Sequence, residues 1–556
     1  MLGSRILVGL LVGMLAGVPG HAAARTLLVD ACTDRVHDVD PARSLFVSEV
    51  EVLENAFTLK ELLRKLVRDA REPGLTPRLI WDEWWDTQNT APGLDLGAHC
   101  DDNGLDNAQP PNGFLNGYPV QCPRAEAQEI DNVPFEEDNP QGSHYKLIAL
   151  VNRFDLAPED GSHCGEYRAV FARVAPEDNG SPGEDGPGVS GGGRNLVIFE
   201  AVLPNPGPSC ELEGCRAIAR YWESLSSEED PVRRGEKLRR FFLFGLPEHG
   251  VEPAIALSHL TKGTGQVRSN MFLDPEPNSG VVKRWQLREF KLARICRGSA
   301  SEGPCRFRVV PVSVKKNPFG PLFSDTPGRF GLAFKRHFQR QVKRLMNPDI
   351  NRFDYDVPNF FNAGQSDAQG AENHYPNQLP EDPDHFFRAR LAERLERLGS
   401  EADPVQLVRR AHVLSCGGCH NPPVESLPPA LGDPGPGDGL GDGMFWADSN
   451  GFTHVTETVM DPEVAVPSFK TSDALKEIFV PHREGVFERF LNAAPCEDCT
   501  PVYLADGGGG VDPASASIVV GEDEPLAISS EALEALDAVL KQGISDRRVG
   551  GASRSH

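Results

Sequence analysis

The motif Cys416-Gly417-Gly418-Cys419-His420 carries the most specific chemistry in this sequence. Two thiols at this spacing can add across the vinyl groups of a haem, and the adjacent imidazole can then bind the iron from one side. With 12 Cys and 15 His in 556 residues, random placement predicts only about 0.007 such motifs. The motif therefore predicts one covalently bound haem c, attached through Cys416 and Cys419, with His420 as an axial iron ligand.

Two other uses of these cysteines remain open. Cys416 and Cys419 can form a disulfide, with each other or with the second C-x-x-C motif at Cys496 and Cys499. The four cysteines together can also bind zinc, but the stretch between the motifs is far longer than in most zinc sites. A thioredoxin-like redox motif requires a βαβ context, which this sequence lacks.

Candidates for the sixth iron ligand follow His420 across a loop rich in Pro and Gly. His454 lies in GFTHVTETV, a β-prone segment that can hold an imidazole firmly. Met460 is followed closely by a proline, an arrangement familiar from small cytochromes, and Met444 is a third candidate. We expect His454 to be the sixth ligand, with Met460 as the alternative. Two strong axial ligands favour electron transfer, whereas an open position permits peroxide or O₂ chemistry.

The N-terminus has the pattern of a secretory signal peptide over residues 1–24. Arg5 precedes an apolar run from Ile6 to Val18, and Ala22 to Ala24 offer small residues for cleavage. A membrane anchor is the alternative, but the run is too short and too broken by glycine to span a bilayer comfortably. Because haem c is attached after export, this reading agrees with the motif. We expect a periplasmic or extracellular protein, with no membrane insertion after signal cleavage.

The composition excludes several classes of partner. The formal net charge is −25, and such a surface repels the phosphates of nucleic acids and anionic lipids. A redox partner protein is expected instead. The sequence does not identify that partner.

Twelve cysteines in an exported chain indicate an oxidising compartment and disulfide bonds. We predict the pairs Cys210–Cys215 and Cys296–Cys305, because each closes a small polar loop. Of the remaining cysteines, two bracket a polar excursion and two have no obvious partner; these are Cys100 and Cys122, and Cys32 and Cys164.

Strand-like segments dominate the centre of the chain, and Gly, Pro, Asp and Ser connect them. They indicate an antiparallel sheet, because regular βαβ alternation is absent. Thr58 and Glu61 form a capping box for an amphipathic helix at 56–70, and further helices are expected at 216–225 and 233–246. The predicted strands are 144–156, 165–174, 195–204, 285–295 and 306–314.

The pattern becomes helical from about residue 385. Helices are predicted at 385–399, at 403–415 with Asp403 as its cap, and at 472–493 with a break or kink at Pro481. The predicted fold class is α+β, with a central antiparallel sheet and helices followed by a mainly α-helical, cytochrome c-like region. The predicted parts are a signal peptide (1–24), an α+β domain with disulfides (25–380), a helical C-x-x-C-H region (381–500), and a Gly-rich linker with a C-terminal helix (501–556).

The motifs ALVNRFDL, CGEYRAVF, NLVIFEAVLP, VRSNMFL, WQLREFKL, SCGGCH and GFTHV occur in this order between residues 145 and 456. In this the chain resembles a group of exported bacterial proteins of uncharacterised function. The resemblance implies one integrated architecture with a single C-x-x-C-H, and it draws attention to His454. The helix before the motif and the helix at 472–493 also resemble the frame of a class I cytochrome c domain.

The sequence therefore favours an exported haem c-binding protein that acts in electron transfer or in redox chemistry at one haem. The alternative is a haem-free, disulfide-stabilised surface or binding protein.

Overall fold

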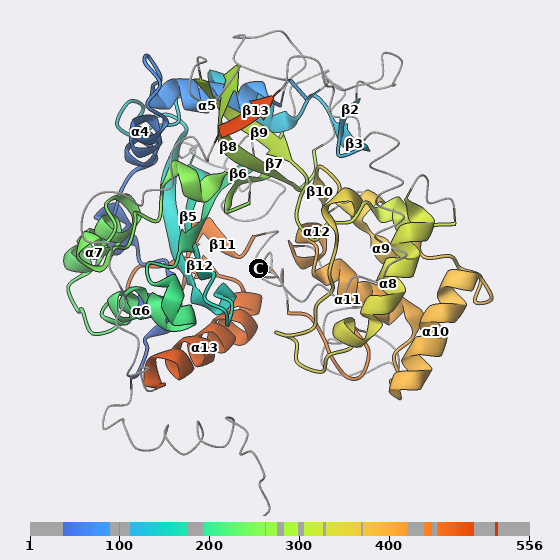
Figure 1. Cartoon of the computed structure of the whole chain (residues 1–556). Coiled ribbons are helices and arrows are strands. Elements are labelled where there is room, and N and C mark those ends of the chain that lie inside the picture. The colour runs from blue at the N-terminus through green and yellow to red at the C-terminus, as the bar shows by residue number, and fades with distance from the viewer. Residues whose placement is uncertain are drawn as a thin grey trace, which may run out of the picture.

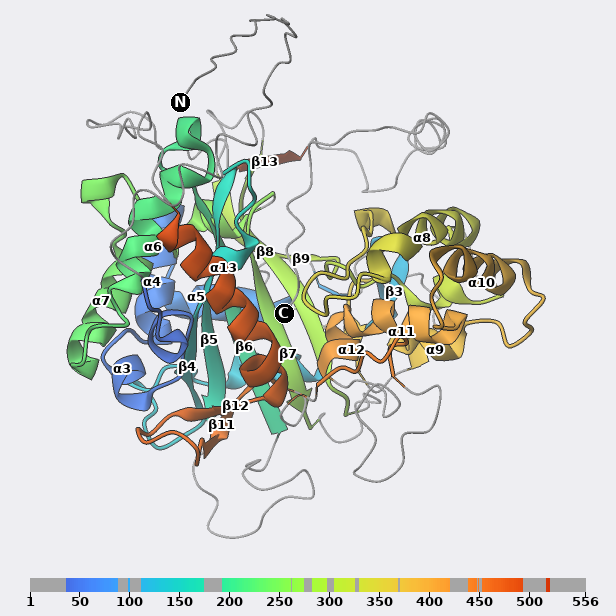
Figure 2. The same ribbon diagram turned by 90° about the horizontal axis from the view of Figure 1, so that it is seen from below.

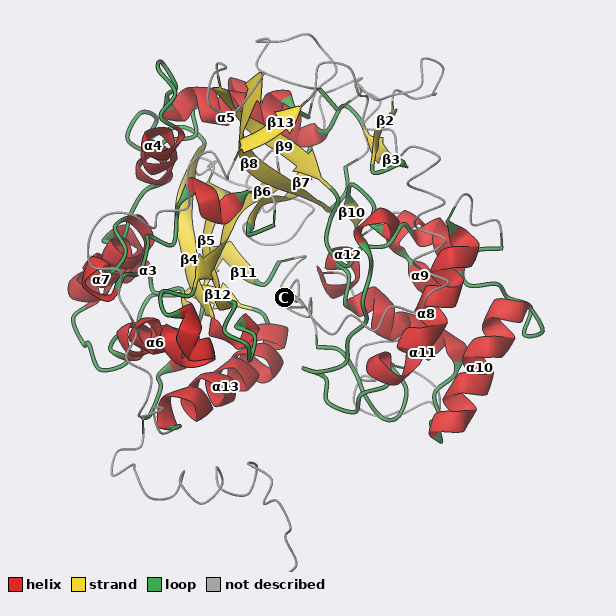
Figure 3. Cartoon of the chain, viewed as in Figure 1, coloured by secondary structure: helices red, strands yellow, loops and turns green. Residues whose placement is uncertain are grey.

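The described chain forms a sheet lobe and a helical lobe that lie side by side (Figure 1). In Figure 3 most strands gather in one lobe, whereas α8 to α12 make up most of the other. The computed structural model describes residues 37–88, 99–100, 112–174, 193–261, 263–274, 283–297, 305–325, 330–368, 371–420, 439–447, 449, 453–493 and 517–520.

Nine strands of the described chain form the main sheet, in the order β1-β4-β5-β6-β7-β8-β10, with β9 and β13 also pairing with β8. These strand pairings are antiparallel except that of β13 with β8, which is parallel. The strands are β1 (Phe46–Val47), β4 (His144–Arg153), β5 (His163–Val174), β6 (Gly193–Pro204), β7 (Gln266–Leu273), β8 (Gln286–Arg297), β9 (Cys305–Val312), β10 (Ser366–Asp367) and β13 (Ser517–Val520).

Helices cover one face of this sheet, since alternate strand residues such as Phe171, Phe199 and Phe290 join one hydrophobic core with them. The expected capping box of Thr58 and Glu61 is present at the start of α4. The helices of this lobe are α2 (Pro41–Ser44), α3 (Val50–Glu54), α4 (Leu59–Ala70), α5 (Pro77–Asp86), α6 (Arg216–Glu223) and α7 (Pro231–Leu243).

The helical lobe has its own hydrophobic core, to which Phe338, Leu391 and Leu407 contribute. Asp403 caps α11 as predicted, with Pro404 in the first turn. The lobe also contains α8, which the sequence pattern did not predict. Its helices are α8 (Gly331–Leu345), α9 (Tyr375–Gln378), α10 (Phe386–Leu398), α11 (Pro404–Val413) and α12 (Cys416–His420).

After α12 the chain returns to the sheet lobe. The two-stranded ribbon of β11 (Val455–Met460) and β12 (Phe469–Thr471) packs on the sheet face opposite the main core, through Val455. A π-helical turn (Ala474–Phe479) then leads into α13 (Val480–Asn492), which lies along the sheet lobe (Figure 2). The predicted break at Pro481 therefore coincides with a change of helix type.

The predicted α+β class is confirmed by the large antiparallel sheet and its helices. The signal peptide at 1–24 and the predicted C-terminal helix lie outside the described residues, and so do Cys32, Cys496 and Cys499. No helix in the described ranges is long and apolar enough to cross a bilayer.

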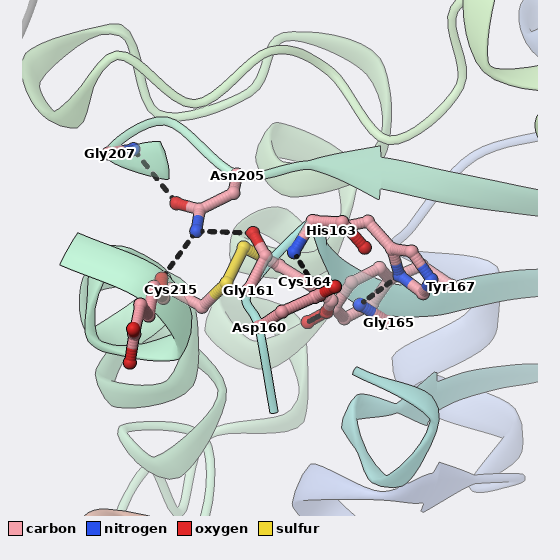
Figure 4. The surroundings of a disulfide bond; sticks show 11 residues. Asp160, Gly161, His163, Cys164, Gly165, Tyr167, Asn205, Gly207 and Cys215 are labelled. Carbon is pink, nitrogen blue, oxygen red and sulfur yellow. Dashed lines mark hydrogen bonds between the residues drawn. A yellow bond between two sulfur atoms is a disulfide. The ribbon is translucent and has the colours of Figure 1, made fainter. Parts of the chain in front are cut away.

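The predicted pairing of Cys210 with Cys215 is wrong. Cys215 is bonded to Cys164, and Cys210 is in a disulfide with another cysteine. Asn205 holds the two segments together, because its Nδ2 donates to the carbonyls of Gly161 and Glu211 at 2.7 and 2.6 Å (Figure 4). The disulfide partner of Cys215 is therefore not the cysteine closest to it in sequence.

Two further pairs of cysteines lie opposite each other in the fold. Cys100 and Cys122 form a disulfide around the polar excursion. Cys305 is disulfide-bonded, and the backbone register sets Cys296 opposite it. The pairing of these two residues stays a prediction.

Cys164→Ala/Cys215→Ala is expected to lower the free energy of unfolding by about 4 kcal/mol, because this bond closes the longer loop in the unfolded chain. Cys100→Ala/Cys122→Ala is the matched control, with an expected loss of about 3 kcal/mol. Guanidinium chloride titrations measure both losses, and a smaller loss for the first pair would contradict the ranking.

Candidate functional site

The motif residues occupy one short helix whose backbone is held from three directions. The Cys419 amide donates to the carbonyl of Ser415 at 2.9 Å. The Gly417 amide donates to Ser366 Oγ of β10 at 2.8 Å, and Ser449 Oγ donates to the His420 carbonyl at 2.6 Å. The turn is thus fixed to the sheet and to the segment that follows the Pro/Gly-rich loop.

The two glycines between the cysteines allow close packing of this turn. A Cβ on Gly418 would lie 2.0 Å from the carbonyl oxygen of His412, so no side chain fits there. A Cβ on Gly417 would lie 3.0 Å from the Asp367 carbonyl, which is tight but less severe. Glycine at 418 is therefore a packing requirement of the motif.

Gly418→Ala is expected to destabilise the protein by about 2–3 kcal/mol and to displace the turn, because overpacking against backbone cannot relax easily. Gly417→Ala is the matched control and should cost clearly less. A denaturant titration of the two variants tests this, and equal losses would count against the packing argument.

Both motif thiols are buried and neither forms a disulfide. This sets them apart from the other cysteines whose side chains the structure describes. Those in disulfides are Cys100, Cys122, Cys164, Cys210, Cys215 and Cys305.

His420 packs against an aromatic ring from the sheet lobe. The indole of Trp285, which precedes β8, stacks on its imidazole with ring centroids 4.7 Å apart and planes inclined by 26°. Trp285 is buried and belongs to a small apolar cluster with Leu287, Val314 and Cys416. Trp285 is not among the site residues predicted from the sequence. Trp285 is the first residue of the WQLREFKL motif, which is the sequence feature that could have identified it.

His454 meets the motif from the other side. Its Nε2 lies 3.2 Å from Cys419 Sγ, and its ring centroid lies 4.6 Å from that of His420. The Nδ1 of His454 lies 2.9 Å from Ser472 Oγ, and Phe479 of the π-helical turn contacts the ring at 6.1 Å between centroids. Ser472 and Phe479 are site residues that the sequence pattern did not reveal.

Burial sets the charge state of this pair. It lowers the pKa of His454 well below its usual value, and the nearby His420 lowers it further. Burial also raises the pKa of the Cys419 thiol well above its usual value, and the proximity of Cys416 adds to the rise. At neutral pH the imidazole is therefore neutral and the thiol protonated. This state suits a metal-ligating histidine and does not suit a Cys–His nucleophile, which needs a thiolate.

The two methionine candidates lie elsewhere. Met460 ends β11 and is 45% exposed. Met444 packs against the core of the helical lobe. The structure thus brings His454 to His420 and leaves Met460 at the surface.

The side chains of the site are of the types that bind a haem c. The site offers two thiols on one helical turn, an adjacent imidazole and a second, neutral imidazole facing it. A porphyrin supplies four nitrogen ligands itself, so the protein needs to give the iron only one or two. Within the described ranges, no group of three or more His, Cys, Asp or Glu side chains is arranged to bind a metal ion.

The two imidazoles are closer together than an iron between them allows. A metal–nitrogen bond of about 2 Å on each side sets the ring centroids roughly 6 Å apart, against the 4.6 Å of this structure. Ligation by both rings therefore requires His454 to move outward by roughly 1.5 Å.

No protein-family model, curated protein or solved structure matches the chain. What the site does is therefore inferred from its own residues.

Proposed function

We propose that this chain is an exported haem c-binding protein that acts in electron transfer or in redox chemistry at a single haem. The observation that supports this most directly is the state of the motif. Cys416, Cys419 and His420 share one short helix, and both thiols stay out of disulfides in a chain whose other described cysteine side chains are bridged.

Each residue of the site has a role under this proposal. Cys416 and Cys419 would hold the haem through thioether bonds, and His420, oriented by its stacking on Trp285, would bind the iron. His454, oriented through Ser472, would be a second ligand. A haem c supplies one-electron redox chemistry to the site. The apolar side chains around Cys416 exclude water from the attachment side.

The test is to produce the full-length chain in bacteria with and without the machinery that attaches haem c. With the machinery, the protein should be red, keep its haem after denaturation, and have a mass one haem above that of the polypeptide. A colourless protein from the competent strain, with Cys416 found in a disulfide by peptide mapping, would establish the haem-free alternative instead.

A further inference from the structure

Charged side chains line the sheet face opposite the main core, the face that Cys416 and β11 contact through Leu287 and Val455. These charged groups are buried and linked into one chain. Arg268 pairs with Glu289 at 2.6 Å and with Glu200 at 2.9 Å. Arg168 pairs with Glu200 at 3.3 Å and with Glu166 at 2.9 Å. This chain holds three carboxylates and two guanidinium groups, and burial lowers the pKa of the nearby Lys291 to about 7.

A neighbouring cluster of buried charges lies at the end of β4, around Asp155. The Nε and Nη2 of Arg153 donate to the two oxygens of Asp155, both at 2.9 Å. Arg483 of α13 approaches the same carboxylate, with Nε 4.0 Å from Asp155 Oδ1, which is beyond hydrogen-bond distance. Two buried guanidinium groups therefore approach the Asp155 carboxylate, and Glu166, which lies opposite Arg153 in the register of β4 and β5, adds a second negative charge near Arg153.

One buried donor of this cluster lacks a hydrogen-bond acceptor. Arg153 Nη1 is buried and has no hydrogen-bond partner in the described chain. Burial lowers the pKa of Arg483 well below its usual value, and the positive charge of Arg153 adds to the shift. A buried donor without an acceptor is costly, and a guanidinium group is paired best by a carboxylate or phosphate.

Arg483 lies near the candidate iron ligand His454. The ring of Phe479 lies 6.0 Å from the guanidinium carbon of Arg483 and 6.1 Å, between centroids, from the imidazole of His454. Arg483 follows Phe479 by one turn of continuous helix. The ring of Phe479 is therefore close to both Arg483 and His454.

We propose that Arg153 and Arg483 form a carboxylate-binding site beside His454. A haem carries two propionate carboxylates, so under the proposed function one propionate occupies this site. Only the source of the carboxylate rests on the proposed function. The site itself rests on the two arginines and their single shared aspartate.

The experiment measures thermal unfolding of the full-length chain as acetate replaces chloride at constant ionic strength. It uses the haem-free variant Cys416→Ser/Cys419→Ser and the haem-bearing chain. Acetate should raise the unfolding temperature of the haem-free chain. Adding Arg483→Gln should raise the acetate concentration for half of this effect at least tenfold. Arg489→Gln, an exposed arginine on the same helix, should leave that concentration unchanged.

The two arms distinguish the sources of the carboxylate. No response in the haem-bearing chain supports a propionate in the site, whereas an equal response in both chains supports a free carboxylate. If the haem-free chain does not respond to acetate, or if Arg489→Gln abolishes the response as Arg483→Gln does, the proposal is overturned. If Arg483→Gln does not fold, Arg483→Lys can replace it. This variant keeps the positive charge but loses the bidentate guanidinium donor, so it should weaken acetate binding. A wild-type affinity in that variant would also overturn the proposal. A chain that never acquires haem refutes the proposed function but leaves this test intact.

Discussion

Cys416→Ser/Cys419→Ser should give a colourless protein whose mass is that of the polypeptide alone, because serine cannot form the thioether bonds that retain a haem through denaturation. The loss of covalent haem should be complete. The main sheet should stay folded, since its core is made by other residues, as in the cluster with Phe171 and Phe199. Absorption spectra, intact mass and circular dichroism of the purified variant measure these outcomes.

The matched control for this change is Cys100→Ser/Cys122→Ser, which also removes two cysteines but belongs to a disulfide elsewhere. It should lose stability and keep its colour. The single variants are informative as well, because either thiol alone can form one thioether bond. Covalent haem that persists in the double variant would show that the attachment lies outside the motif.

His454→Ala should convert a low-spin haem into a high-spin one that binds small external ligands, because the variant removes the imidazole that faces His420. The wild-type spectrum should lack the sulfur-to-iron band of methionine ligation near the red edge of the visible. Electronic absorption and paramagnetic resonance spectra of the ferric protein measure the change in spin state.

Met460→Ala is the control for that experiment. Met460 is 45% exposed at the end of β11, so its loss should leave the spectrum low-spin. Ser472→Ala should give an intermediate result, since it removes the hydrogen-bond partner of His454 Nδ1 and leaves the ligand in place. A low-spin His454→Ala protein together with a high-spin Met460→Ala protein would assign the methionine as the ligand.

Local sequence patterns predicted much of the fold, because each strand or helix depends mainly on neighbouring residues. The capping box of α4, the proline at the start of α11 and the strands β4, β5 and β6 all appear where the patterns place them. The elements that were missed include β7 and α8. In β7, Arg268 and Asn270 face the charged side of the sheet. In α8, Phe334, Phe338, Val342 and Leu345 are buried at helical spacing, so its apolar pattern was present in the sequence among many basic residues.

The cysteine pairs show what local patterns leave undecided. Cys210 and Cys215 are close in sequence, but the register of β5 and β6 sets His163 opposite Pro204. That register brings the start of β5 next to the segment after β6, and Cys164 is therefore close enough to Cys215 to form the disulfide. The choice of partner depends on strand pairing, which the spacing of cysteines does not encode.

The sequence by itself determined the chemistry proposed at Cys416, Cys419 and His420, because the reacting groups are contiguous and need only one helical turn to position them. Only the tertiary structure decided what surrounds that turn. It brought Trp285 and His454 to His420 and left Met460 at the surface. It also set Arg153 and Arg483 around one aspartate, from two segments far apart in the chain. Such contacts depend on how distant segments pack, and packing leaves no periodic trace in the residues that take part.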